Sequence, residues 1–221
     1  MTQHTFTGFS PGAQRFFREL EANNHKDHWH ASKEAFHRDV RDPLRALLAP
    51  LEGKLGAFKA FRMNRDTRFS ADKSPYKLMH GAGSASPGGS IAYVHVDKDG
   101  VFLGEGIYLM SPAQLKRFRG AIDSGAATAL KRILASLRRA GIEVGPGGSP
   151  PLKTAPRGYP RDHAHVELLR WKGLTAASRP SAATFRSAAL SKEVARFFRR
   201  TASLRTWIDT HVGAADDRRS A

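Results

Sequence analysis

Residues 91–110 read IAYVHV-DKDG-VFLGEGIYLM, and this stretch decides the fold class. Residues 91–96 and 101–110 are rich in β-branched and aromatic residues, and their hydrophobic pattern has the period of two that strands show. The turn between them, Asp97-Lys98-Asp99-Gly100, contains the Asp-Gly pair that tight hairpin turns favour. We therefore predict an antiparallel β-hairpin. Gly104 and Gly106 inside its second strand predict a bulge or the close approach of another backbone or a ligand.

The chain before the hairpin reads mainly as helix. Ser10-Pro11-Gly12 is a helix start, with the serine as cap and the proline in the first turn. A longer helix is predicted from about Lys26. Pro43 predicts a kink or a break in this helix after Asp42, because proline cannot donate the helical hydrogen bond. Residues 58–62 read as a strand, and residues 81–89, rich in Gly and Ser, read as a loop.

The chain after the hairpin returns to helix. Ser111-Pro112 begins a helix that ends near Gly125, and a second helix is predicted over about 126–140. A terminal helical pair is predicted over 192–200 and 204–212. Strands in the middle with helices before and after them predict an α+β fold with a central antiparallel sheet, and not an alternating βαβ fold.

We expect residues 9–212 to form a single domain. The length of 221 residues suits one domain. The Gly/Pro-rich piece at residues 145–151 is too short to be a domain linker. Residues 1–8 and 213–221 are expected to be flexible ends.

The composition is strongly basic and contains no cysteine. Lys and Arg number 36 against 20 Asp and Glu, which gives a net charge of +16, so the chain attracts anions of any kind. The absence of cysteine excludes disulfides, thiolate catalysis and cysteine-ligated metals, and it fits a reducing compartment. The first residues do not read as a signal peptide and no apolar run is long enough to span a membrane. We therefore expect a cytoplasmic protein with no membrane partner.

Residues 61–77 read FRMNRDTRFSADKSPYK and are called the cationic string below. Five cations and two carboxylates give it an excess of three positive charges. The Ser-Ala-Asp and Ser-Pro pieces are turn chemistry, which fixes the backbone. Cations held on turns between aromatic anchors predict a preorganised site for an anion. The predicted ligand-binding residues are Arg62, Arg65, Asp66, Arg68, Lys73, Tyr76 and Lys77.

The cationic string resembles the signature of the bacterial and fungal family called domain of unknown function 2461. The similarity is carried by Arg65-Asp66-Thr67-Arg68-Phe69-Ser70 and by Asp72-Lys73-Ser74-Pro75-Tyr76-Lys77. It extends to residues 16–24 with Trp29, to Gly104-Glu105-Gly106-Ile107-Tyr108 and to residues 156–170, so that it covers roughly 9–212. Trp29-His30 departs from the family in the opening segment, where a Phe is often found. The resemblance implies a shared fold and a shared site, and no established activity.

Glu105 and His163 are the candidates for proton transfer if the site is catalytic. Glu105 is a carboxylate on a predicted strand between two glycines. His163 follows Asp162, and a carboxylate beside an imidazole suits a general base.

We predict neither a metal site nor a cofactor. His25, His28 and His30 cluster within six residues, but no carboxylate or cysteine accompanies them at a metal-ligand spacing, so we interpret them as solvated side chains. The pair Gly104-x-Gly106 lacks the third glycine and the strand-to-helix setting of a dinucleotide fingerprint.

Three functions from different classes remain after this reading. The leading one is a site for a small molecule that carries phosphate or carboxylate, with Arg65, Arg68, Lys73 and Lys77 as clamps and Tyr76 as a hydrogen-bond donor. The first alternative is a nucleic-acid binder that works through its basic charge, although no recognition motif accompanies it. The second is a protein-interaction module in which the cationic string is only architecture, with Arg65 and Asp66 paired with each other and with Glu105.

Overall fold

The computed structural model describes residues 5–68 and 70–215. The expected flexible ends therefore fall partly on residues 1–4 and 216–221, which lie outside the described residues, as does Phe69 of the cationic string. Phe6 belongs to the expected flexible end at residues 1–8. It is nevertheless buried, and its ring packs edge-on against Phe9 with 5.3 Å between centroids.

The described strands form a six-stranded antiparallel sheet in the order β1-β2-β3-β4-β6-β5, with helices before and after its central strands. The predicted α+β class and the predicted hairpin are confirmed, since two strands of this sheet flank a turn at Lys98 and Asp99. The strands are β1 (Lys59–Ala60), β2 (Met79–Ala85), β3 (Ile91–Asp97), β4 (Gly100–Ile107), β5 (Glu143–Gly145) and β6 (Leu174–Ser178).

The chain divides into two compact units, each built from three separate segments. Unit 1 comprises residues 1–84, 93–103 and 179–197, and unit 2 comprises residues 85–92, 104–178 and 198–221. Because β3 and β4 contribute residues to both, no single cut of the chain releases an intact unit. We retain the single domain over 9–212 as a proposal on this ground.

The helices of unit 1 begin where their caps predict. The Ser10 hydroxyl accepts a hydrogen bond from the Gly12 N–H at 3.1 Å. A π-helical turn, His37–Arg41, stands just before Pro43 and accommodates the proline, whose ring nitrogen cannot donate to the preceding turn. The helices are α1 (Pro11–Ala22), α2 (Lys26–Phe36), α3 (Asp42–Leu48), α4 (Glu52–Leu55), α8 (Ala182–Phe185) and most of α9 (Ala189–Arg200).

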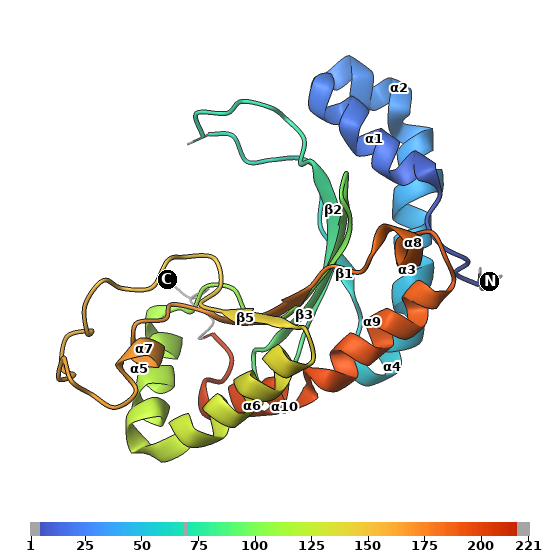
Figure 1. Ribbon diagram of the computed structural model, residues 1–221. Helices are drawn as coiled ribbons and strands as arrows, with labels where there is room; N and C mark the ends of the chain where they lie inside the picture. The colour runs from blue at the N-terminus through green and yellow to red at the C-terminus, as the bar shows by residue number, and fades with distance from the viewer. Residues whose placement is uncertain (1–4, 69, 216–221) are drawn as a thin grey trace. The chain divides into compact units, whose positions relative to one another are not determined.

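The described helices of unit 1 lie on one face of its strands (Figure 1). Val94 and Val96 of β3 and Leu103 of β4 point into this side and are fully buried. Phe9 stacks on Phe185 with 4.7 Å between ring centroids. The alternate residues of β3 are half-exposed, so the opposite face of the sheet is available for polar side chains.

The expectation of a loop over residues 81–89 is wrong for 81–85, because β2 extends to Ala85, and it is confirmed for 86–89. The sequence pattern does not indicate this strand, because residues 81–85 are small and have low strand propensity. Their smallness has a steric cause at Gly81, where a β-carbon would lie 2.9 Å from the Cβ of His95 and 2.9 Å from the carbonyl of Val94. The predicted strand over 58–62 is shortened to β1, which pairs Lys59 with Gly83.

Unit 2 confirms the predicted close approach at Gly106. This residue has φ 127°, and a β-carbon on it would collide with the carbonyl of Leu174 on β6. Ser111 and Gln114 form a reciprocal capping box at the start of α5. The helices are α5 (Pro112–Ala121), α6 (Ala127–Arg139), α7 (Val166–Leu169) and α10 (Ala202–His211), with a π-helical turn at Ile122–Ala126. None of the described helices is long and apolar enough to cross a bilayer.

A buried carboxylate organises unit 2. Glu105 is 1% exposed, forms an ion pair with Arg205 and accepts a hydrogen bond from the Ser90 hydroxyl at 2.9 Å. Burial raises the pKa of Glu105, and the hydrogen bonds from Arg205 oppose that shift. The neighbouring Asp209 accepts from the Ser86 hydroxyl at 2.7 Å.

We predict that Arg205→Met lowers the free energy of unfolding by about 3–5 kcal/mol, because it leaves Glu105 buried and unpaired. Adding Glu105→Gln to this variant should recover a large part of the loss, since the buried charge is then gone. Arg200→Met, at an exposed position of α9, is the matched control and should change stability by less than about 0.5 kcal/mol. Urea denaturation measures all three. Equal stability of Arg205→Met and Arg200→Met would contradict the role of this pair.

A second prediction concerns His80, which is 5% exposed in the core of unit 1. Burial lowers the pKa of His80 to about 4, and the charges of Arg41 and Lys77 act in the same direction. Between the ordinary histidine pKa and this value, the unfolded chain binds a proton that the folded chain does not. Stability should therefore fall as the pH falls through this window, by up to about 3 kcal/mol at pH 4.

His80→Leu should remove this part of the pH dependence. The measurement is the free energy of unfolding in urea at neutral pH and near pH 4 for both chains. The difference between the two chains isolates His80, because the other titrating groups are common to both. Parallel losses in the two chains would show that His80 does not titrate as inferred.

Candidate functional site

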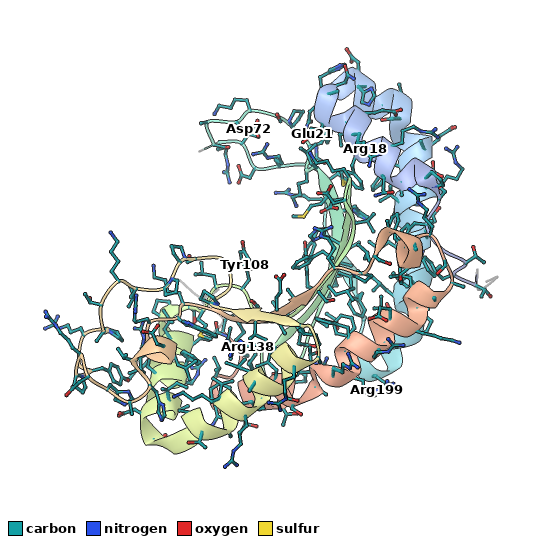
Figure 2. All side chains as sticks on the ribbon, viewed as in Figure 1. Arg18, Glu21, Asp72, Tyr108, Arg138 and Arg199 are labelled. Atoms are coloured by element: carbon teal, nitrogen blue, oxygen red, sulfur yellow. The ribbon has the colours of Figure 1, made fainter. Side chains whose placement is uncertain are left out.

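The cationic string forms a hairpin-like excursion between β1 and β2, on which Asp72 is labelled in Figure 2. The two arms of the excursion are joined by backbone hydrogen bonds. The Arg65 N–H donates to the Pro75 carbonyl at 2.8 Å and the Lys77 N–H donates to the Met63 carbonyl at 2.8 Å. These two bonds hold the arms of the string side by side.

The two carboxylates of the string pair with two of its cations. Asp72 binds Arg65, and Asp66 binds Arg68 at 2.7 Å. These pairs hold the pKa of each carboxyl below its usual range, and in Asp72 a hydrogen bond from Ser74 adds to the effect of Arg65. The predicted pairing of Arg65 and Asp66 with each other and with Glu105 is wrong, because Arg65 binds Asp72, Asp66 binds Arg68 and Glu105 binds Arg205. The alternative that the string is only architecture stays a prediction.

The two lysines of the string brace its backbone. Lys73 Nζ donates to the Thr67 carbonyl at 3.0 Å, and Lys77 Nζ donates to the Arg62 carbonyl at 2.9 Å. Arg62 itself is exposed. An ammonium group has three donors, so one bond to a carbonyl leaves Lys77 able to bind a ligand as well.

Tyr76 anchors the string to the helices of unit 1. It is 6% exposed and its ring stacks on Trp29 with 4.7 Å between centroids. The Asn24 side chain accepts from the Tyr76 N–H at 3.1 Å and donates to the Tyr76 carbonyl at 2.9 Å. Asn24 and Trp29 belong to the opening segment of the family resemblance, so this segment and the string support each other directly.

An open pocket of about 410 Å³ lies where the string meets the sheet. Three predicted site residues line it, and Arg62, Asp66, Arg68 and Lys73 are outside its lining. Its charged groups are therefore two cations of the string and one carboxylate of β3. The lining residues are Arg65, Tyr76, Lys77, Leu78, Met79 and Asp97.

The carboxylate in the pocket belongs to a chain of polar contacts on the half-exposed face of β3. Tyr93 Oη lies 3.1 Å from His95 Nδ1, and His95 Nε2 lies 3.1 Å from Asp97 Oδ2. Asp97 also binds Arg179 through both carboxylate oxygens, each at 2.9 Å. We call Tyr93, His95, Asp97 and Arg179 the strand relay.

The charge of Asp97 is secured by its partners. Burial alone would raise the pKa of this carboxyl, but hydrogen bonds from His95, Arg179 and the Asp99 N–H together outweigh it and hold the pKa well below the usual range. Asp97 is therefore an anion at neutral pH. An anion can only accept, so the nitrogen of His95 that faces it carries a proton.

The predicted proton-transfer residues belong to unit 2, whereas the residues of the pocket lining belong to unit 1. Glu105 is enclosed by Arg205 and Ser90, as described above. His163 Nε2 lies 3.2 Å from Asp123, and its Nδ1 accepts from the His165 N–H at 3.0 Å. The carboxylate partner of His163 is therefore Asp123, and the adjacent Asp162 is exposed.

Sequence reasoning missed the strand relay, although its signal is present. Tyr93, His95 and Asp97 stand at every second position of a strand that was predicted, so their side chains share one face. Arg179 follows β6, whose pairing no local pattern indicates. Within the described part of the chain, no group of three or more His, Asp or Glu residues is arranged to hold a metal ion.

Comparison with known proteins identifies the family and no activity. A family model described as conserved hypothetical protein (DUF2461) matches residues 13–207, which include both the cationic string and the strand relay. No curated protein and no solved structure matches the chain. Because the family model covers most of the sequence, the chain belongs to the DUF2461 family.

Proposed function

We propose that unit 1 binds a small molecule bearing a phosphate or carboxylate group in the open pocket lined by Arg65 and Lys77. The observation that supports this function best is the meeting of these two cations at one cavity, although they stand twelve positions apart in the sequence. A volume of about 410 Å³ lies within the range of small-molecule sites.

The donors of the two cations suit an anion. Arg65 is bonded to Asp72 through one terminal nitrogen, and a guanidinium has five N–H donors in a planar fork that fits phosphate and carboxylate. Lys77 adds a compact charge. The negative charge of Asp97 is already compensated by Arg179, so its repulsion of an anionic ligand is reduced.

The rest of the lining indicates the remainder of the ligand. Leu78 and Met79, which are 38% and 39% exposed, give the lining an apolar part. They would cover an apolar part of the ligand while the cations hold its charged end. Arg68 and Lys73, which lie outside the lining, are assigned to bracing the string and not to clamping the ligand.

Thermal melts in inorganic phosphate and in succinate test the function. The wild-type melting temperature should rise with the concentration of at least one of these anions, relative to chloride at equal ionic strength. A ligand at one hundred times its dissociation constant stabilises by about 2.7 kcal/mol, so even a weak site gives a measurable shift. Arg65→Gln and Lys77→Gln should each reduce the shift strongly.

Lys73→Gln is the matched control, since it removes a cation of the same string that does not line the pocket. All three variants should fold, because exposed ion pairs and braces contribute only about 0–1 kcal/mol each. Loss of the anion effect in Lys73→Gln to the same degree as in Arg65→Gln would contradict the assigned pocket, as would a wild-type protein that responds to neither anion.

The nucleic-acid alternative is favoured by one surface in unit 2. Helix α6 carries exposed cations at Lys131, Arg132, Arg138 and Arg139 and no acidic residue. Such a surface gives weak binding that falls steeply with salt. Tight binding of an oligonucleotide at about 150 mM salt, with no response to phosphate or succinate, would rank this alternative first.

We place the protein in the cytoplasm, in keeping with a sequence that contains no cysteine.

A further inference from the structure

We infer that the strand relay is a proton-transfer site, in which His95 accepts the phenolic proton of Tyr93 and the Tyr93 oxygen exchanges a proton with a ligand in the neighbouring pocket. This goes beyond anion binding and rests on the proposed function only for the identity of the ligand. Its physical basis is the order of the three side chains along one strand face.

The contacts of His95 are consistent with proton transfer from Tyr93 to His95. The Asp97 carboxylate accepts the hydrogen on Nε2 of His95, at 3.1 Å, so a neutral His95 presents an unprotonated Nδ1 to the hydroxyl of Tyr93, also at 3.1 Å. His95 would then act as a general base, and the Asp97 carboxylate would hold its ring in the required orientation. A positive charge that develops on His95 when it takes the proton is stabilised by Asp97.

The position of the His95 ring is set by Phe102, by Asp97 with its partner Arg179, and by the space at Gly81. The His95 ring stacks on Phe102 with 4.9 Å between centroids and an angle of 14°. Arg179 lies over the same Phe102 ring at 5.6 Å while it binds both oxygens of Asp97. Gly81 leaves the space in which the relay stands, because a β-carbon there would lie 3.2 Å from Tyr93 Oη.

The relay also reaches the pocket at two points. Asp97 lines the pocket directly. Tyr93 Oη lies 3.6 Å from the sulfur of Met79, another lining residue. The side chains of His95 and Asp97 are 12% and 16% exposed, so the relay is mostly shielded and its access to a ligand is through the residues that line the pocket.

Labelling of the full chain with phenylmethylsulfonyl fluoride tests the activation of Tyr93. In this reaction the phenol oxygen forms a bond to sulfur, the sulfur–fluoride bond breaks, fluoride leaves and the phenolic proton passes to His95. Peptide mass spectrometry gives the rate at each tyrosine. The other three, Tyr76, Tyr108 and Tyr159, are internal controls.

We expect Tyr93 to be labelled faster than Tyr108 by about 100-fold, the low end of a general-base effect. Tyr108 is 70% exposed, so exposure alone would give the opposite order. His95→Gln should reduce labelling of Tyr93 to the level of an ordinary tyrosine. Asp97→Asn should reduce it too, since an amide can donate to His95 and turn the protonated nitrogen towards Tyr93.

His163→Gln is the matched control, because His163 also faces a carboxylate but lies in unit 2 and outside the proposed site. Labelling of Tyr93 should be unchanged in this variant, and circular dichroism should show all three variants folded. The reagent is uncharged, so the result does not depend on Arg65 or Lys77 and can fail or succeed independently of anion binding. A rate order that follows exposure, or a wild-type rate at Tyr93 in His95→Gln, overturns the inference.

Discussion

The period of two along β3 is the constraint on which the rest of unit 1 depends. Val94 and Val96 are fully buried against the helices, so their neighbours Tyr93, His95 and Asp97 must point to the other face. A shift of register by one residue would bury the relay and expose the valines, which makes such a shift very unfavourable. The core therefore fixes the orientation of the candidate site, and Tyr76 belongs to both.

Two buried or half-buried carboxylates illustrate different uses of the same chemistry. Glu105 is enclosed with Arg205 and Ser90 and has a raised pKa, so it organises the interior of unit 2. Asp97 has stronger combined partners, a lowered pKa and one side towards a pocket. The first arrangement stabilises a fold, and the second keeps a fixed negative charge next to an imidazole and within reach of a ligand.

The sequence predicted those features that depend on local chemistry. The hairpin and the serine caps follow from backbone rules that act over a few residues, and each is found. At Pro43 the predicted break is replaced by a π-helical turn just before the proline. Gly106 was recognised as a point of close approach for the same reason. Strand β2 was missed because Gly81 has no room for a side chain beside Val94 and His95 of β3, and this crowding is visible only once the two strands are paired.

The candidate site could be predicted only in part. The cationic string identified Arg65 and Lys77, but which of its five cations reach a pocket depends on how the string folds back on itself. Lys73 and Lys77 both donate to carbonyls of the string, yet only Lys77 lines the pocket, and no spacing rule distinguishes the two. Arg179 joins the relay across more than eighty residues, a distance over which sequence patterns alone carry no pairing information.

The most direct test of a ligand site on this face of the sheet is a phosphate titration followed by nuclear magnetic resonance of the ¹⁵N-labelled chain. Saturable shifts should concentrate on the backbone signals of Arg65, Lys77 and Met79 and on the ring nitrogens of His95, with those of His163 unchanged. Shifts that spread over the exposed cations of α6 without saturating, or that leave the β3 face unaffected, would contradict the account.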